Sequence, residues 1–142
     1  MVARLTILFI CIGNSCRSPM AEAIARAAGG DTVDARSAGI TPLGWVSEQT
    51  IGALEALGYP AEGLSSKGLD EVDLEDVDII LSLLGDRGLD CIPHRIGARR
   101  EAWDIADPFG EDDELYLEVG RELERRIRNL ISEERDTELF PV

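Results

Sequence analysis

Residues 4–28 read Arg4-Leu-Thr-Ile-Leu-Phe-Ile10, then Cys11-Ile-Gly-Asn-Ser-Cys-Arg17, then Ser18-Pro-Met-Ala-Glu-Ala-Ile-Ala-Arg-Ala-Ala28. The first part is mostly apolar and rich in strand-forming residues, which predicts a strand buried on both faces. In the third part, a capping serine and a first-turn proline precede an alanine-rich run, which predicts a helix that ends at Gly29 and Gly30. The chain therefore opens with a strand, a tight loop and a helix.

The rest of the chain continues this alternation. We expect strands at 32–38, 78–83 and 102–105, helices at 46–57 and 111–134, a helical turn or short helix at 70–77, and a loop or broken helix at 85–100. Such alternation predicts the α/β class, here a single-domain three-layer sandwich in which a four-stranded parallel sheet is flanked by helices. The 142 residues suit one domain, so we expect residues 1–142 to share a single core.

The charge of the chain is strongly negative. Twenty-eight acidic and fourteen basic residues give a formal net charge of -14, and Lys67 is the single lysine. Nucleic acids and anionic membranes attract basic patches, so we expect neither as a partner. Such a chain suits a cytoplasm with high salt, which screens the repulsion between carboxylates, although a local function of the charge is a second interpretation.

The location of the protein is expected to be cytoplasmic. The apolar run at 5–12 is too short to span a bilayer, and polar residues follow it directly, so no targeting segment is predicted. The chain has three cysteines, an odd number that does not describe a disulfide framework. They fit a reducing compartment, where thiols perform chemistry or simply pack.

The loop between the first strand and the first helix carries the candidate chemistry. Backbone N–H groups of such a loop, together with the N-terminus of the helix, stabilise both a bound oxyanion and a thiolate, so Cys11 is predicted to be a nucleophile. The guanidinium of Arg17 can hold two oxygens of an anion in a fork. We expect the oxyanion to be bound by Ile12, Gly13, Asn14, Ser15, Cys16, Arg17 and Ser18.

A simpler interpretation of this loop has to be weighed. A bare Cys-x5-Arg pattern occurs by chance, and a cysteine at the end of a strand is commonly a small buried hydrophobe. However, Gly13 gives the backbone freedom, Asn14 tolerates an unusual φ, and Ser18 can donate to a thiolate or cap the helix. This combination favours a catalytic loop.

The segment Cys11-x-Gly13-Asn14-x-Cys16-Arg17-Ser18-Pro19-Met20-Ala21-Glu22 resembles the phosphate-binding loop of the low-molecular-weight protein tyrosine phosphatases and of the arsenate reductases that share their fold. Ser37-Ala38-Gly39 matches another segment of this superfamily, and Asp107-Pro108 matches its general-acid Asp-Pro. The resemblance implies that Cys11 attacks a tetrahedral oxyanion, that Arg17 holds it, and that Asp107 protonates the leaving oxygen. We expect no cofactor, and no residues have the spacing of metal ligands.

Several features resemble the arsenate reductase branch. Ser15 matches the Gly-Asn-Ser-Cys-Arg-Ser of the reductases, whereas tyrosine phosphatases usually have isoleucine there and protein-arginine phosphatases have threonine. The segment Arg100-Glu-Ala-Trp103-Asp-Ile-Ala-Asp107-Pro108 is similar to their Arg-Glu-x-Trp-x-x-x-Asp-Pro, and the stretch 78–107 is compact, as in that branch. The first interpretation is therefore a thiol-dependent arsenate reductase.

Other features resemble the phosphatases. Ser18-Pro19 and Asp107-Pro108-Phe109-Gly110 are similar to the phosphatase versions of these segments. The thioredoxin-coupled reductases use two further cysteines in a Cys-Gly-x5-Cys pattern, and here the stretch is Leu84-Gly85-Asp-Arg-Gly-Leu-Asp-Cys91, so the first of these thiols is missing. The alternative is a tyrosine or arginine protein phosphatase that hydrolyses phosphomonoesters through a phosphocysteine intermediate.

Arsenate reduction needs a second thiol, which attacks the Cys11 sulfur so that arsenite departs. Cys91 is the candidate within the chain, because it follows a glycine-containing loop near the predicted carboxyl edge of the sheet. A disulfide needs Cα atoms within roughly 7 Å, so we expect this loop to move. Otherwise a thioredoxin, a glutaredoxin or a small thiol supplies the second sulfur.

The remaining candidates have simpler interpretations. Cys16 is expected to pack inward, with a redox role as the alternative. His94 is expected at the surface, and Trp45 and Trp103 are expected in the core or in the wall of a pocket. The carboxylates at 111–114 suit a solvated helix start, which the helix dipole favours.

Overall fold

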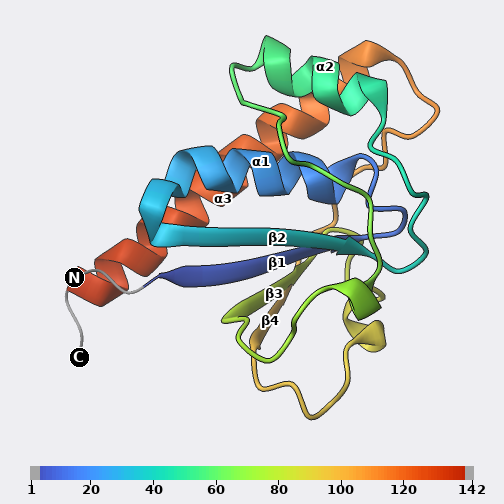
Figure 1. Ribbon diagram of the computed structural model, residues 1–142. Helices are drawn as coiled ribbons and strands as arrows, with labels where there is room; N and C mark the ends of the chain where they lie inside the picture. The colour runs from blue at the N-terminus through green and yellow to red at the C-terminus, as the bar shows by residue number, and fades with distance from the viewer. Residues whose placement is uncertain (1–3, 140–142) are drawn as a thin grey trace.

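The computed structural model describes residues 4–139, with side chains described through residue 136. Within these residues, four parallel strands form one sheet in the order β2-β1-β3-β4 (Figure 1). The strands are β1 Leu5–Cys11, β2 Val33–Gly39, β3 Ile79–Ser82 and β4 Arg99–Ala102. The predicted α/β class and the four-stranded parallel sheet are therefore confirmed.

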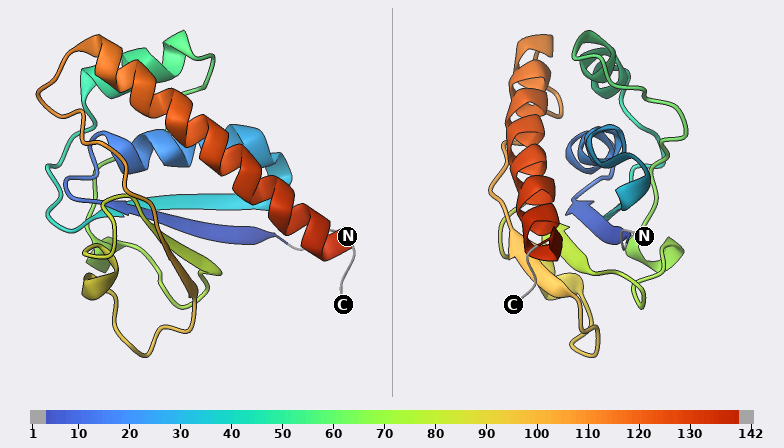
Figure 2. Two further views of the ribbon diagram at one scale, coloured as in Figure 1. Left: turned by 180° about the vertical axis from the view of Figure 1, so that it is seen from behind. Right: turned by 90° about the vertical axis from the view of Figure 1, so that its left-hand side faces the viewer.

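The α-helices of the described residues lie on one face of the sheet (Figure 1, Figure 2). They are α1 Arg17–Gly29, α2 Glu48–Ala56 and α3 Asp113–Leu139. The opposite face is covered by the connections that contain two 3₁₀-helices, η2 Leu69–Glu71 and η3 Leu89–Cys91, while η1 Gly30–Thr32 joins α1 to β2. The second outer layer of the sandwich thus consists of short turns and not of α-helices.

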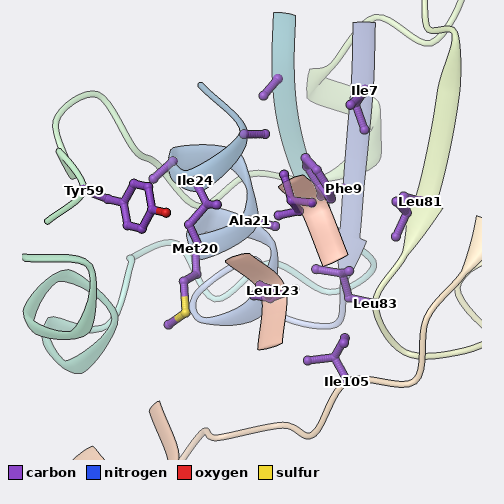
Figure 3. Close-up of a cluster of buried hydrophobic side chains, with 14 of the residues drawn as sticks. Ile7, Phe9, Met20, Ala21, Ile24, Tyr59, Leu81, Leu83, Ile105 and Leu123 are labelled. Carbon is purple, nitrogen blue, oxygen red and sulfur yellow. The ribbon is translucent and has the colours of Figure 1, made fainter. Parts of the chain in front are cut away.

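The central strand β1 is buried on both faces, as its apolar sequence predicts. Ile7 and Phe9 belong to a core cluster with α1 and α3, whereas Leu8 and Ile10 belong to a second cluster on the other face. All four side chains are fully buried. Figure 3 shows Ile7, Phe9 and Leu123 among the side chains of the first cluster. Packing on both faces holds β1 in place in the sheet, and the candidate loop begins where β1 ends, at Cys11.

The last strand differs from its prediction. A strand at 102–105 is wrong, because β4 spans Arg99–Ala102. The predicted range contains the apolar residues Trp103 and Ile105. The observed strand β4 lies at the edge of the sheet, and edge strands commonly carry charged, half-exposed residues such as those of β4. The N–H groups of Trp103 and Ile105 still donate to carbonyls at and just past the end of β3, so the chain continues beside that strand.

The helices begin and end close to their predicted positions. α2 has Ser47 as its N-cap, whose hydroxyl accepts from the Thr50 N–H at 3.1 Å. The helical segment expected at 70–77 is only the short η2, and α3 continues past residue 134. Within residues 4–139, no helix has the length and apolar character that crossing a membrane requires.

We expect the melting temperature of this protein to rise steeply between roughly 0.1 M and more than 1 M salt. The Debye length falls from about 10 Å to about 3 Å over this range, which screens the repulsion within a chain of net charge -14. The consecutive exposed carboxylates at 111–114 are one place where this repulsion acts. Calorimetry in a potassium chloride series measures the effect. An unchanged melting temperature would assign the acidity to a local function instead.

Candidate active site

The candidate loop lies at the carboxyl edge of the sheet. β1 ends at Cys11, α1 begins at Arg17, and a cavity of about 200 Å³ opens over the residues between them. The cavity is lined by residues 11–13 and 15–17 of the loop, by residues 41 and 43, and by Asp107 and Phe109. Of the predicted oxyanion-binding residues, Asn14 and Ser18 do not line it. Ligands of parallel α/β sheets bind at this edge, so the structure places the loop where a ligand is expected.

Cys11 is buried and lines this cavity. Its Sγ lies 2.9 Å from Ser18 Oγ, and the backbone N–H of Ser18 donates to it at 3.4 Å. Ser18 stands in the first turn of α1, so its hydroxyl faces Cys11 and does not cap the helix. Hydrogen bonds to a sulfur and a nearby helix N-terminus both favour the thiolate form.

The guanidinium of Arg17 is held from behind by two backbone carbonyls. Its Nη1 donates to Ile105 O at 3.0 Å and to Leu83 O at 3.3 Å. Its Nη2 lies 3.6 Å from Asp107 Oδ2, and the Asp107 carboxyl is about half exposed. The carbonyls that follow β3 and β4 therefore hold the guanidinium of Arg17 in place beside the loop, and the carboxyl group of Asp107 lies next to it.

Asn14 adopts a left-handed backbone conformation, with φ of 48°, and its amide is fully used. Nδ2 donates to Ser18 Oγ at 2.7 Å and to Ser37 Oγ at 2.9 Å, and Oδ1 accepts from the Lys67 N–H at 2.8 Å. Ser37 in turn donates to Glu22 Oε1 at 2.6 Å. Sequence reasoning did not place Glu22 in the site, although its position in the loop motif was a signal.

The end of β2 and the residues that follow it are hydrogen-bonded to the loop. The N–H groups of residues 40, 41 and 43 donate to the carbonyls of residues 11, 12 and 13. A Cβ at Gly39 would lie 2.7 Å from Ile12 O and 2.8 Å from Asn14 N, so only glycine allows this approach. This close approach explains the glycine of the Ser37-Ala38-Gly39 segment.

The second thiol of the loop packs inward, as predicted. Cys16 is buried, and its Sγ lies 3.3 Å from Tyr116 Oη of α3. Burial, together with the contact to Cys16, raises the pKa of Tyr116 to about 12. The Ser15 carbonyl accepts from Thr50 Oγ1 at 2.9 Å, which adds a contact with α2. The far side of the loop is thus tied to both α2 and α3.

The mouth of the cavity is apolar. Ile12, Leu43 and Phe109 line it and are 41%, 37% and 53% exposed. Trp45 was expected in the core or in the wall of a pocket, but it is 57% exposed and does not line this cavity, so it lies neither in the core nor in the wall of this site. Trp103 packs against the first core cluster as expected, and His94 is exposed.

Cys91 lies apart from the other candidate catalytic residues. It is an exposed free thiol on η3 and does not line the cavity, whereas Cys11, Arg17 and Asp107 all do. The connection before it is packed closely against β3, because a Cβ at Gly88 would lie 2.1 Å from Ser82 Oγ. Among residues with described side chains, no group of three histidine, cysteine or acidic residues is arranged to hold a metal ion.

A cysteine and an arginine in one loop, at a helix N-terminus and at the carboxyl edge of a parallel sheet, are typical of enzymes that attack tetrahedral oxyanions through sulfur. The sequence matches the family described as low molecular weight phosphotyrosine protein phosphatase over residues 6–139. The chain belongs to this family.

Similar proteins in this family fall into two groups. The chain is 30% identical to a glutaredoxin arsenate reductase of Synechocystis sp. over 127 residues, which are 89% of this chain and 95% of that protein. It is 32% identical to an arsenate reductase of Staphylococcus aureus over 127 residues, with 89% and 96% coverage. A solved arginine phosphatase from Geobacillus stearothermophilus is 28% identical, with a TM-score of 0.85 and 97% of both chains covered. These similar proteins are enzymes, and so is this chain.

Proposed function

We propose that this protein is a thiol-dependent arsenate reductase. The observation that carries the proposal is the cavity of about 200 Å³, where Cys11, Arg17 and Asp107 meet. Arsenate is a small tetrahedral anion, so the loop N–H groups and Arg17 hold its oxygens while the sulfur faces arsenic. The similarity to arsenate reductases over most of the chain supports this substrate.

The reaction has two steps at sulfur. The Cys11 thiolate attacks arsenic, an S–As bond forms, and one oxygen leaves as water after Asp107 protonates it. A second thiolate then attacks the Cys11 sulfur, an S–S bond forms, and the electron pair of the S–As bond stays on arsenic. Arsenic is thereby reduced from As(V) to As(III) and leaves as arsenite, while the two thiols are oxidised to a disulfide.

We assign the second thiol to a thioredoxin, a glutaredoxin or a small thiol of the cytoplasm, where thiols are kept reduced. Cys91 is the internal alternative, but it does not line the cavity, and its connection is packed against β3. The name of the Synechocystis relative, which refers to glutaredoxin, supports an external thiol.

Cys91→Ser is therefore expected to leave arsenate turnover unchanged in the presence of a thioredoxin or glutaredoxin system. The reason is that the external thiol reaches Cys11 directly and needs no relay. Consumption of NADPH with arsenate measures turnover, and peptide mapping after limited reduction identifies the disulfides. Two results together would establish the internal relay instead. The Cys91→Ser variant would stop after it had reduced a single equivalent of arsenate, and the unsubstituted protein would contain a Cys11–Cys91 disulfide.

The proposed activity is tested by one comparison. Purified protein is assayed for NADPH consumption with arsenate plus each reductant system, and for hydrolysis of an aryl phosphate without reductant. Arsenate-dependent thiol oxidation supports the proposal. Hydrolysis without any such oxidation would contradict it.

Phosphomonoester hydrolysis is the second candidate, because the apolar mouth favours it. Ile12, Leu43 and Phe109 offer a surface that a bare arsenate ion does not need and that the organic part of an ester would contact. In this reaction Cys11 forms a phosphocysteine, Asp107 protonates the leaving oxygen, and water releases phosphate.

A further inference from the structure

The large apolar side chains that are exposed among the described residues gather at the mouth of the catalytic cavity. Ile12, Leu43 and Phe109 line the cavity, and Trp45 follows Leu43 closely in the chain. Soluble proteins rarely leave such side chains together in water unless the patch contacts a partner. Trp45 does not line the cavity, so an ion bound inside it does not cover this indole. The mouth therefore has the features of a surface that another protein contacts.

The backbone holds Trp45 at the edge of this mouth. The Leu43 N–H donates to Gly13 O at 3.0 Å, and the Ser47 N–H donates to Ser15 O at 3.1 Å. Trp45 thus lies between two residues that are hydrogen-bonded to the catalytic loop. A residue whose backbone is already fixed loses less conformational entropy when a partner binds.

A groove of about 350 Å³ between α2 and α3 adjoins the mouth. Glu48 and Asp113 line this groove, and they follow Trp45 and Phe109 closely in the chain. Gln49 Nε2 donates to Asp113 Oδ1 at 2.8 Å, so the starts of the two helices are joined where they lie side by side (Figure 2). The rest of the lining is small or apolar and includes Gly52, Ala53, Ala56 and Leu117.

Gly52 is a glycine that the packing of the protein does not require. It lies inside α2, where glycine lowers the stability of a helix. A Cβ at this position would meet no atom within 4 Å, whereas a Cβ at Gly120 of α3 would lie 2.6 Å from Leu57 Cδ1. Close packing therefore explains Gly120 and not Gly52. A groove that must stay open for a partner gives a reason for Gly52.

The charge around the mouth and the groove is negative. Glu48 and the consecutive carboxylates at 111–114 are all exposed there. A symmetric contact with a second copy of this chain would bring like charges together, and an anionic membrane would also be repelled. A partner with apolar and basic side chains complements this surface. In the groove, the apolar lining suits the stem of a lysine or arginine, and the carboxylates suit its charged end.

We propose that the mouth and the groove together form a docking surface for a protein dithiol, whose reactive cysteine is exposed among apolar and basic side chains. This inference rests on the proposed arsenate reduction, in which an external thiol attacks Cys11. Cys11 is only 3% exposed, so the attacking sulfur must enter the cavity. Contacts outside the cavity hold the partner in the orientation that this entry requires.

The docked partner supplies both electrons of the reduction. Its first thiolate attacks the Cys11 sulfur, an S–S bond forms, and the electron pair of the S–As bond stays on arsenic, which leaves as arsenite. Its second thiolate then attacks the partner's own sulfur in this mixed disulfide, so Cys11 departs as a thiolate and the partner keeps the disulfide. Basic side chains beside the partner's cysteine favour the thiolate that attacks.

The experiment compares arsenite formation driven by a protein dithiol with arsenite formation driven by dithiothreitol. The protein dithiol is pre-reduced glutaredoxin or thioredoxin, whichever supports the faster reaction of the unsubstituted protein. We expect Gly52→Arg and Trp45→Ala each to raise the KM for this protein about tenfold, the usual effect of losing an important interface contact, with kcat unchanged. Turnover with dithiothreitol should not change, because a small dithiol needs no docking.

Gly97→Arg is the matched control for Gly52→Arg. It adds the same charge at another exposed glycine where a Cβ would meet no atom within 4 Å, in the connection before β4 at the amino edge of the sheet. Its KM for the protein dithiol should equal that of the unsubstituted protein. Arginine is a better helix former than glycine, so α2 should persist in Gly52→Arg, and circular dichroism checks each variant.

Calorimetric titration with glutaredoxin and with thioredoxin measures docking without arsenate, so a failed arsenate assay and failed docking are separate results. Weaker binding by Gly52→Arg and Trp45→Ala, with Gly97→Arg unchanged, supports the docking surface. An unchanged KM and affinity in both variants, or an equal loss of turnover with dithiothreitol, would overturn it. Slower hydrolysis of a phosphopeptide with basic flanks, with the KM for the protein dithiol unchanged, would assign the surface to a protein substrate and also overturn it.

Discussion

Cys11→Ser is expected to lower both arsenate reduction and aryl phosphate hydrolysis by on the order of 10⁶-fold, the usual effect of removing a covalent nucleophile. A serine hydroxyl stays protonated where a thiol ionises, so the attack on arsenic or phosphorus does not begin. The side chain is buried at the end of β1 and nearly isosteric with serine, so the fold should persist.

Two further measurements separate lost chemistry from lost structure in this variant. Calorimetric titration with phosphate should still detect binding, because the loop N–H groups and the Arg17 guanidinium are unchanged. Thermal unfolding should remain cooperative and close to that of the unsubstituted protein. Turnover comparable to the unsubstituted protein in either assay would remove Cys11 from the role of nucleophile.

The opening unit was predictable because its signals are local. β1 and α1 begin within a few residues of their predicted positions, since an apolar run and an alanine-rich run each specify one element. β4 was misplaced by three residues, because an edge strand with charged side chains is defined by its pairing with β3. The two short 3₁₀-helices over the second face of the sheet, η2 and η3, also depend on tertiary packing, which no local sequence pattern shows.

The site was predictable in part. The loop motif and Asp107-Pro108 indicated Cys11, Arg17 and Asp107, and the structure brings these three to one cavity. The sequence could not show that Cys91 lies away from that cavity, because its place depends on how the connection packs. It also could not show the link from Glu22 to the sulfur, since the link passes through residues of three different segments.

Asp107→Asn is expected to slow the hydrolysis of an aryl phosphate about 10² to 10⁴-fold, because asparagine cannot donate a proton to the leaving oxygen. The Asp107 carboxyl lines the cavity, with Oδ2 3.6 Å from Arg17 Nη2 and Oδ1 accepting from the Phe109 N–H at 3.1 Å. An asparagine keeps a carbonyl oxygen for the Phe109 contact, so the local backbone should be preserved.

The dependence of this loss on the leaving group distinguishes an acid from a structural residue. A very acidic phenol departs without protonation, so its phosphate ester should lose little activity in Asp107→Asn. A weakly acidic phenol needs the proton, so its ester should lose the full factor. The measurement is kcat for a series of aryl phosphates with the variant and the unsubstituted protein. The ratio of the two should increase steadily as the leaving group becomes less acidic, whereas a constant ratio would mean that Asp107 only holds the cavity in shape.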